Sequence, residues 1–229
     1  MIQWIYRPSR LACRIYFALW HRSKIVGREN VPSTGPVLLL ANHASFLDPP
    51  LVGCVCGRDA RFIARSTLGE GSLFGRFLHA VGVRFIDRDG SARAGLERAI
   101  DELSKGHAVF VFPEGRRTDD GRLGEIRAGF QIILRKVPVP VIPVGVRGTF
   151  KSWSRHQRFP RPHRCEVHFG QPMSAAEALG PDGLTLVRER IAALAGLDAE
   201  SAKASTVAVR DTTSYSPGDH GGAGIHPSL

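Results

Sequence analysis

A histidine and an aspartate lie five residues apart in segment 42–48, which has the sequence Asn-His-Ala-Ser-Phe-Leu-Asp. The segment directly follows the apolar run Val-Leu-Leu-Leu-Ala at 37–41, which predicts a buried strand. Ligands bind at the carboxyl ends of strands in α/β sheets. His43 therefore stands where a general base would meet a substrate, and Asp48 could control its tautomer and its charge.

The two side chains can meet only if the chain turns between them. On a straight helix, five residues correspond to a rotation of about 500°, which puts the side chains on different faces. Pro49 removes this obstacle, because the residue before a proline avoids the right-handed helical conformation. We predict that residues 45–47 turn Asp48 back toward His43, and that Asp48 is the N-cap of the helix that follows. The alternative is a packed loop histidine beside an aspartate that only caps the helix.

A second cluster occupies residues 112–118, which have the sequence Phe-Pro-Glu-Gly-Arg-Arg-Thr and again follow a predicted strand. Gly115 allows another group to approach the backbone closely. Arg116 and Arg117 offer planar guanidinium groups that suit a phosphate. A solvated basic turn would have the same composition, so this cluster alone does not define a site.

Together, the two clusters resemble the glycerophospholipid acyltransferases, specifically the 1-acyl-sn-glycerol-3-phosphate acyltransferase family. That family is marked by four ordered blocks, of which the first is Asn-His-x-Ser-x-x-Asp and the third is Phe-Pro-Glu-Gly-Thr-Arg-Ser. The order and the separations in this chain fit the family. The matching blocks lie at 42–48, 82–88, 112–118 and 139–144, a family-like lead-in lies at 27–32, and the resemblance spans 25–173.

The resemblance implies direct acyl transfer from acyl-CoA or acyl-carrier protein to the sn-2 hydroxyl of a 1-acyl-glycerol-3-phosphate, which yields phosphatidate for phospholipid biosynthesis. His43, oriented by Asp48, would take the proton of the hydroxyl as it attacks the thioester. No cofactor, metal ion or acyl-enzyme is implied, because the thioester is already activated. Ser45 is the alternative nucleophile, yet the chain has no Gly-x-Ser-x-Gly elbow.

The resemblance also assigns an acceptor pocket. Arg88 and Arg117 would hold the phosphate of the acceptor, while Glu114 and Gly115 would shape the pocket. Arg116 stands where the family usually has threonine, and we place it at the acceptor region as well. This departure concerns the choice of acceptor more than the type of reaction.

Two other functions are compatible with the sequence. The same chemistry could act on another lysolipid, and a non-catalytic protein that binds lipid or nucleic acid could keep the fold and the charge. Basic and aromatic residues are interleaved in segment 150–164, where they suit RNA, a second membrane contact, a CoA phosphate or a plain solvated loop. The pair of His43 and Asp48 favours the enzyme, because binding alone would not require it. We therefore expect no nucleic-acid partner.

The composition excludes several classes of protein and implies an anionic partner. The chain has 229 residues, of which 43% are hydrophobic, enough for a sizeable core and too many for a disordered protein. Its 31 Lys and Arg residues outnumber its 21 Asp and Glu residues, for a net charge of +10, which suits nucleic acid, a membrane surface or a phosphorylated substrate. The four cysteines have no metal-binding spacing, and we expect no metal site.

Residues 1–24 form a basic, aromatic segment that we expect to contact an anionic membrane surface. No acidic residue precedes Glu29, and apolar residues recur from Ser9 onward at helical spacing beside arginines. The longest apolar run in the segment, at 15–20, is far shorter than the roughly 20 residues that span a bilayer. We predict a peripheral or monotopic protein on the cytoplasmic face of the cell membrane. The alternative is an ordinary surface helix.

The remaining sequence alternates between strand and helix patterns, which predicts an α/β fold with a mixed, largely parallel sheet flanked by helices. Two prolines in the segment 139–146 predict a sheet edge or a strand end. We predict one acyltransferase domain at 25–197 and a disordered tail at 198–229. The expected strands lie at 37–41, 61–64, 83–86, 108–112, 139–146 and 165–169, and the expected helices at 72–80, 91–105 and 184–194.

Overall fold

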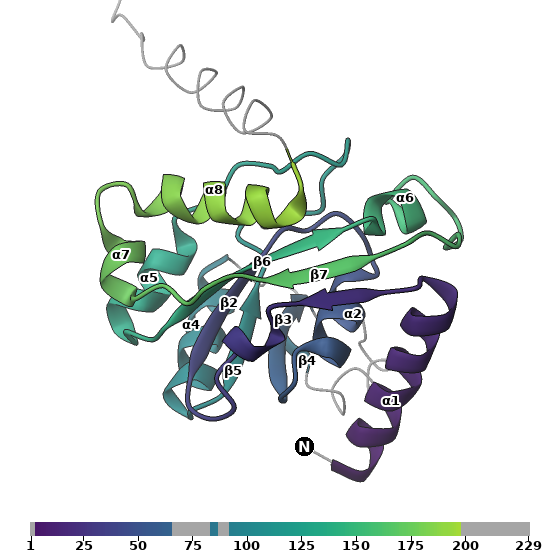
Figure 1. Ribbon diagram of the computed structural model, residues 1–229. Helices are drawn as coiled ribbons and strands as arrows, with labels where there is room; N and C mark the ends of the chain where they lie inside the picture. Colours follow the sequence, from purple (N-terminus) through teal and green to yellow (C-terminus); the bar gives the residue numbers. More distant parts are fainter. Residues whose placement is uncertain (1–2, 66–82, 87–91, 198–229) are drawn as a thin grey trace, which may run out of the picture.

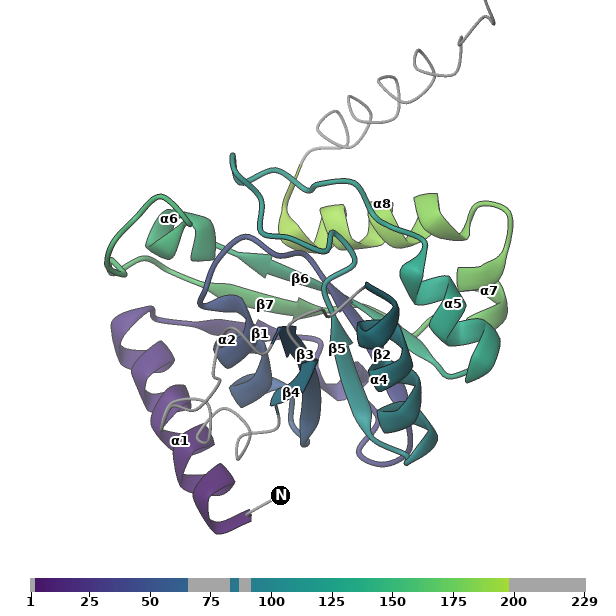
Figure 2. The same cartoon turned by 180° about the vertical axis from the view of Figure 1, so that it is seen from behind.

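The computed structural model, which describes residues 3–65, 83–86 and 92–197, places a seven-stranded sheet between layers of helices (Figures 1 and 2). The strand order is β1-β7-β6-β2-β5-β3-β4. The strands are β1 (Lys24–Val26), β2 (Val37–Ala41), β3 (Ala60–Arg65), β4 (Val83–Ile86), β5 (Ala108–Val111), β6 (Val141–Arg147) and β7 (Glu166–Phe169). The helices are α1 (Gln3–Trp20), η1 (Arg28–Asn30), α2 (Asp48–Val55), α4 (Ala92–Ser104), α5 (Gly129–Lys136), α6 (Thr149–Trp153), α7 (Ala175–Leu179) and α8 (Gly183–Ala195).

The sheet is mixed and largely parallel, as the alternating pattern predicts. All described strand pairs run parallel except β6 and β7, which are antiparallel. The expected α/β fold is therefore confirmed. The predicted helix at 72–80 and the predicted tail at 198–229 lie outside the described residues, and the predicted domain boundaries remain predictions.

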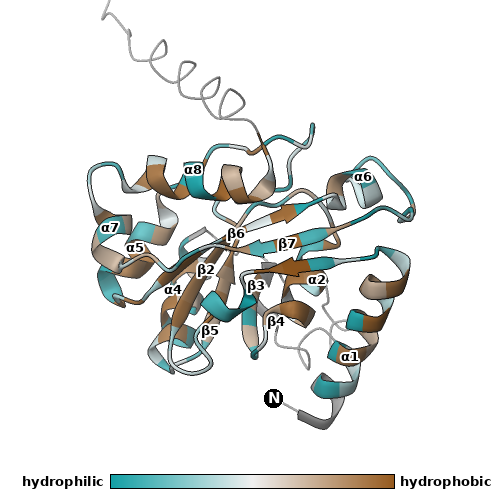
Figure 3. Cartoon of the chain, in the orientation of Figure 1, coloured by the Kyte–Doolittle hydropathy of each residue, from teal (hydrophilic) through white to brown (hydrophobic). Residues whose placement is uncertain are grey.

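The central strand β2 is buried on both of its faces. Val37, Leu39 and Ala41 pack into the core beneath α1 and α2, whereas Leu38 and Leu40 pack into the core beneath α4, α5 and α8. Helices on both sides leave no place for a polar side chain, which explains why the strand is apolar without alternation. Hydrophobic colouring is correspondingly concentrated in the central strands (Figure 3).

Strand β6 lies in the interior of the sheet, so the edge position predicted from its prolines is wrong. β6 pairs with β2 on one side and with β7 on the other. The carbonyl of Pro143 accepts a hydrogen bond from the amide of Gly170, which follows the last residue of β7. Because the nitrogen and the carbonyl of a strand residue face the same side, the missing N–H of Pro143 faces the end of β7 and not β2.

Helix α1 begins at Gln3, earlier than the start at Ser9 that the apolar pattern predicts. Its Phe17 is buried in the core beside α2, while Leu11, Ile15 and Leu19 are exposed. Within the described residues, no helix combines the length and the hydropathy needed to cross a membrane.

We predict that Gly145→Ala in β6 lowers the free energy of unfolding by about 1–3 kcal/mol. A methyl group at this position would overlap the backbone of Leu194 and Ala195 in α8, which packs directly on the strand. Gly180→Ala is the matched control, because its added methyl group would lie 3.4 Å from the nearest atom, the carbonyl oxygen of Glu177. Denaturant unfolding measures both variants, and equal stabilities would contradict the proposed close packing of α8 on β6.

Candidate active site

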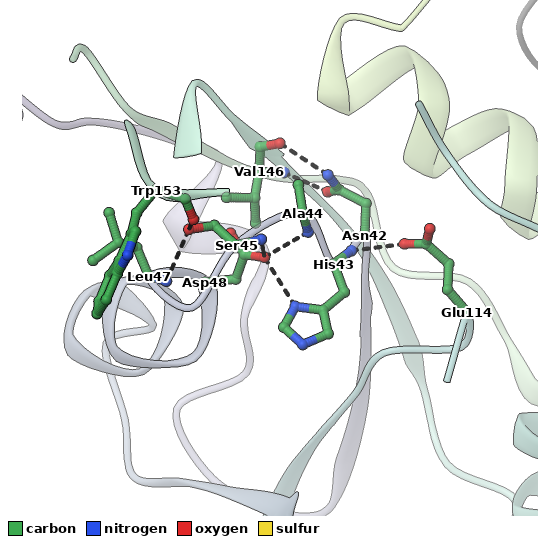
Figure 4. A network of polar contacts seen from close by, with 9 residues as sticks. All are labelled: Asn42, His43, Ala44, Ser45, Leu47, Asp48, Glu114, Val146 and Trp153. Carbon is green, nitrogen blue, oxygen red and sulfur yellow. Dashed lines mark hydrogen bonds and ion pairs between the residues drawn. The ribbon is translucent and has the colours of Figure 1, made fainter. Parts of the chain in front are cut away.

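The structure brings His43 and Asp48 together immediately after the central strand (Figure 4). The Nδ1 atom of His43 lies 2.9 Å from Oδ2 of Asp48. The same Oδ2 accepts hydrogen bonds from the backbone amides of Ala44 and Ser45, each at 2.7 Å. The turn between the two residues therefore folds Asp48 back toward the histidine, as the spacing predicts, and the aspartate is fully buried.

Asp48 does not cap the helix, so that part of the sequence prediction is wrong. Leu47 is the N-cap, Asp48 is the first residue of α2, and no side chain caps the helix. An N-cap side chain would bond the amides of the second and third helical residues. For Asp48 as the N-cap, those residues would be Pro50, which has no N–H to donate, and Leu51, whose amide donates to the carbonyl of Leu47. The carboxylate of Asp48 is consequently available for the turn and the histidine.

The hydroxyl of Ser45 is used by the backbone around it. Its Oγ donates to the carbonyl of Trp153 at 2.6 Å and accepts from the amide of Leu47 at 3.0 Å. The side chain is fully buried. These contacts connect the turn to the end of α6 and leave Ser45 without the exposed hydroxyl that a nucleophile needs.

Asn42 attaches the start of the turn to β6. Its side chain donates to the carbonyl of Val146 at 3.0 Å and accepts from the amide of the same residue at 2.7 Å. This pair of bonds extends the contact between β2 and β6 past the last residue of β2. Sequence reasoning did not assign Asn42 a role, although an amide side chain directly after a buried strand was the available signal.

Glu114 holds the backbone of His43 from the opposite side, as Figure 4 shows. Its Oε1 accepts from the amide of His43 and its Oε2 from the amide of Gly124, both at 2.7 Å. The carbonyl of His43 accepts from the amide of Thr118 at 2.9 Å. Burial raises the pKa of Glu114 above its ordinary value, and the two amides act in the opposite direction. The carboxylate thus holds the backbone of His43 in position, and its predicted role in shaping the acceptor pocket stays a prediction.

The imidazole ring of His43 is held in one orientation. It stacks on Phe112 with 4.1 Å between the ring centroids and an angle of 20° between the planes. Because the Asp48 carboxylate accepts from Nδ1, the proton of the neutral ring sits on Nδ1 and the lone pair on Nε2. Within the described part of the chain Nε2 has no hydrogen-bond partner, and the side chain is 18% exposed. These are the properties of a general base.

Arg117 and Arg116 point into different surroundings. The guanidinium carbon of Arg117 lies 3.4 Å from the ring centroid of Phe46, and its Nη1 is buried without a hydrogen-bond partner among the described residues. Burial, followed by the charge of Arg155, lowers the pKa of Arg117 below its ordinary value, while Asp48 acts in the opposite direction. The side chain of Arg116 is 74% exposed and lies 3.5 Å from Asp119.

The other predicted site residues are distributed as follows. Gly115 lies in the exposed turn beside Arg116 with φ +72°, a conformation that favours glycine. Arg88 lies outside the described residues. Among the described residues, no three His, Cys, Asp or Glu side chains gather into a group that could hold a metal ion.

The described cysteines are free thiols. Burial raises the pKa of Cys54 to about 12, that of Cys56 to about 11 and that of Cys165 to about 12. Burial also raises the pKa of the half-buried Cys13. The thiols are therefore protonated and unreactive near neutral pH.

Fold and site define an α/β protein with a histidine–carboxylate pair at the carboxyl end of its central strand, held by a second block from the neighbouring strand β5. Residues 22–147 match the family model Acyltransferase, which is more than half of the chain, and the protein belongs to this family.

Named relatives and a solved structure agree with that assignment. The protein is 35% identical over 146 residues to the chloroplastic 1-acyl-sn-glycerol-3-phosphate acyltransferase BAT2 of Brassica napus, a match that covers 62% of this chain and 42% of the relative. It is 30% identical to 1-acyl-sn-glycerol-3-phosphate acyltransferase alpha of Mus musculus, covering 74% of this chain and 61% of the relative. The matched region thus spans less than two thirds of the length of each of these relatives.

The fold is similar to the crystal structure of the 1-acyl-sn-glycerophosphate (LPA) acyltransferase PlsC from Thermotoga maritima. The TM-score is 0.71 and the sequence identity is 25%, and the match covers 88% of this chain and 81% of that one.

We predict that Glu114→Gln lowers the free energy of unfolding by about 1–3 kcal/mol, the cost of a buried donor without an acceptor. An amide has one oxygen where the carboxylate has two, so either His43 or Gly124 would face an NH₂ group. Glu125→Gln, an exposed change of the same charge nearby, should stay within about 0.5 kcal/mol of the unchanged protein. Urea unfolding of both variants tests this, and equal effects would show that the Glu114 contacts do not stabilise the site.

Proposed function

We propose that the protein transfers a fatty acyl group from an acyl thioester to the sn-2 hydroxyl of lysophosphatidate, giving phosphatidate. The observation that carries the proposal is the contact of His43 Nδ1 with Asp48 Oδ2, which leaves Nε2 of His43 as a free base. The names of the relatives and of the structural neighbour support the choice of acceptor.

The proposed reaction proceeds without a covalent enzyme intermediate. Nε2 of His43 takes the proton of the acceptor hydroxyl while the oxygen attacks the thioester carbonyl carbon. This attack forms the new carbon–oxygen bond and a tetrahedral adduct. Collapse of the adduct restores the carbonyl, breaks the carbon–sulfur bond and releases the thiolate, which takes the proton back from the imidazolium. Asp48 stabilises the imidazolium while the proton is held there. No further cofactor takes part, because the thioester supplies the activated acyl group.

Arg117 is the described residue best suited to hold the acceptor phosphate. It lies one residue from Thr118, whose amide contacts the carbonyl of His43, so it adjoins the proposed base. Its buried Nη1 has no partner in the described part of the chain, and a phosphate oxygen would satisfy this donor. Arg116 faces solvent beside Asp119, and we assign it no contact with the acceptor. Arg88 remains a second candidate from the sequence.

We further propose that α1 lies on an anionic membrane surface, with the protein peripheral or monotopic at the cytoplasmic face. The exposed Leu11, Ile15 and Leu19 support this, since they lie on one side of the helix beside its arginines. The acyl donor is acyl-CoA or acyl-carrier protein, and both belong in the assay.

The test is turnover of the purified protein in mixed micelles with a panel of lysolipids, with thiol release followed for each donor. We expect thiol release that depends on lysophosphatidate and exceeds the rate with water as acceptor. If the protein prefers another lysolipid, that lysolipid is the acceptor and lysophosphatidate is not. If the folded protein releases no thiol with any pair of donor and lysolipid, the proposed enzyme is rejected and the alternative of a non-catalytic binding protein remains.

We predict that His43→Ala lowers turnover by about 10²- to 10⁴-fold, the usual contribution of a general base. His107→Ala is the matched control, because that histidine pairs with Glu102 beside β5, away from the site, and its loss should leave turnover unchanged. Steady-state kinetics and thermal unfolding are measured on both variants. Retention of more than about a tenth of the activity by His43→Ala would mean that another group is the base.

We predict that Arg117→Gln lowers kcat/KM for lysophosphatidate by about tenfold to a hundredfold, the value of a charge-assisted hydrogen bond to phosphate. Arg116→Thr removes a charge from the adjacent, exposed position and should have little effect. Hydrolysis of the thioester with water as acceptor should be unchanged in both variants, because it needs no phosphate contact. If Arg117→Gln slows hydrolysis as much as acyl transfer, the arginine supports the fold or the donor and not the acceptor.

A further inference from the structure

A cavity of about 290 Å³ lies between α1 and the carboxyl-terminal end of α2. Its described lining residues are Arg7, Arg10, Leu11, Arg14, Arg28 and Gly57, which include four arginines and no acidic residue. Gly57 follows the last turn of α2, whereas Asp48 begins that helix. The cavity is thus separated from the proposed catalytic pair by the length of α2, about 12 Å at 1.5 Å per residue.

Two of the four arginines are fixed by the protein itself. Nε of Arg10 donates to the carbonyl of Cys54 at 3.1 Å, and its Nη1 lies 3.8 Å from Asp59. Arg28 rests on Gly57, where an added Cβ would lie only 2.8 Å from its Nε. Gly57 has φ +93°, so the turn and the close approach both call for glycine. The walls of the cavity are therefore built before any ligand arrives.

Three of the four arginines lack a compensating carboxylate among the described residues. Within the described residues, Arg7, Arg14 and Arg28 have no ion pair with a carboxylate. Several like charges around one cavity repel one another, and an anion bound between them would relieve that repulsion. Planar guanidinium groups suit the oxygens of a phosphate in particular.

The surroundings of the cavity identify the source of the phosphate. Leu11, which also lines the cavity, is followed at four-residue intervals by Ile15 and Leu19, and these side chains are 59%, 50% and 78% exposed. Residues four apart lie on one side of a helix, so an apolar stripe runs along α1 beside its arginines; Figure 3 shows hydrophobic and hydrophilic residues interspersed along this helix. A phosphate that lies next to an exposed apolar stripe is a feature of a phospholipid and not of a soluble nucleotide.

We propose that this four-arginine cavity binds the phosphate of an anionic phospholipid headgroup, while the apolar stripe of α1 enters the acyl region beside it. The proposal rests on the membrane contact proposed above for α1. It adds a specific lipid site that is separate from the acceptor site at Arg117.

The test compares binding of the full chain to vesicles of equal measured surface potential, made of phosphatidylcholine with either phosphatidate or oleate. Phosphatidate offers a phosphate and oleate only a carboxylate, so the unchanged protein should prefer phosphatidate. The double variant Arg14→Gln with Arg28→Gln should lose at least about tenfold in affinity for phosphatidate vesicles and lose the preference. The control, Arg135→Gln with Lys136→Gln, removes the same charge from exposed positions on α5 and should retain the preference.

Three outcomes would overturn the inference. If the two double variants lose affinity for phosphatidate vesicles equally, the cavity contributes only its positive charge and is not a specific phosphate site. Free CoA is added as a competitor. If it displaces the unchanged protein from phosphatidate vesicles but does not displace the Arg14 and Arg28 variant, the cavity binds a soluble phosphate. Failure of the unchanged protein to bind either vesicle would reject the membrane contact itself, while lysophosphatidate-dependent thiol release in micelles would still test the proposed reaction independently.

Discussion

The buried carboxylate of Asp48 is the interaction on which the site depends. Burying an ionised group is unfavourable unless donors surround it, and here one oxygen accepts from two backbone amides and from the ring of His43. The requirement fixes the conformation of the whole turn, because all of these donors come from three consecutive residues. The two prolines at the start of α2 contribute by removing the helical amides that would otherwise compete for the carboxylate.

The sheet brings the other half of the site into place. β2 and β5 are neighbouring parallel strands, and Leu40 is in register with Val111. The segments that follow the two strands therefore begin side by side at the same edge of the sheet. Glu114 can therefore reach the amide of His43 although the two residues are far apart in the sequence. Asn42 makes the corresponding attachment to β6 on the other side. The turn that carries the histidine is held from both neighbouring strands.

Features that depend on local pattern could be predicted from the sequence, and features that depend on distant partners could not. The run at β2, the helix α4 and the approach of Asp48 to His43 follow from hydrophobic spacing and turn chemistry. The interior position of β6 does not, because it depends on where β7 ends opposite Pro143. The contrast between Arg116 and Arg117 was equally inaccessible: the two are adjacent in one turn, and only the position of Phe46 shows which is partly buried.

The buried thiols have a consequence for the acyl transfer from a thioester that we propose. A thiolate near a bound acyl thioester would exchange with it and carry the acyl group on its own sulfur, which would divert the donor and block the pocket. Burial raises the pKa of Cys54, Cys56 and Cys165 to about 12, 11 and 12, so the thiolate form is scarce at neutral pH. Burial thus protects these described thiols against self-acylation in the proposed reaction, in which the acyl group passes to the hydroxyl deprotonated by His43.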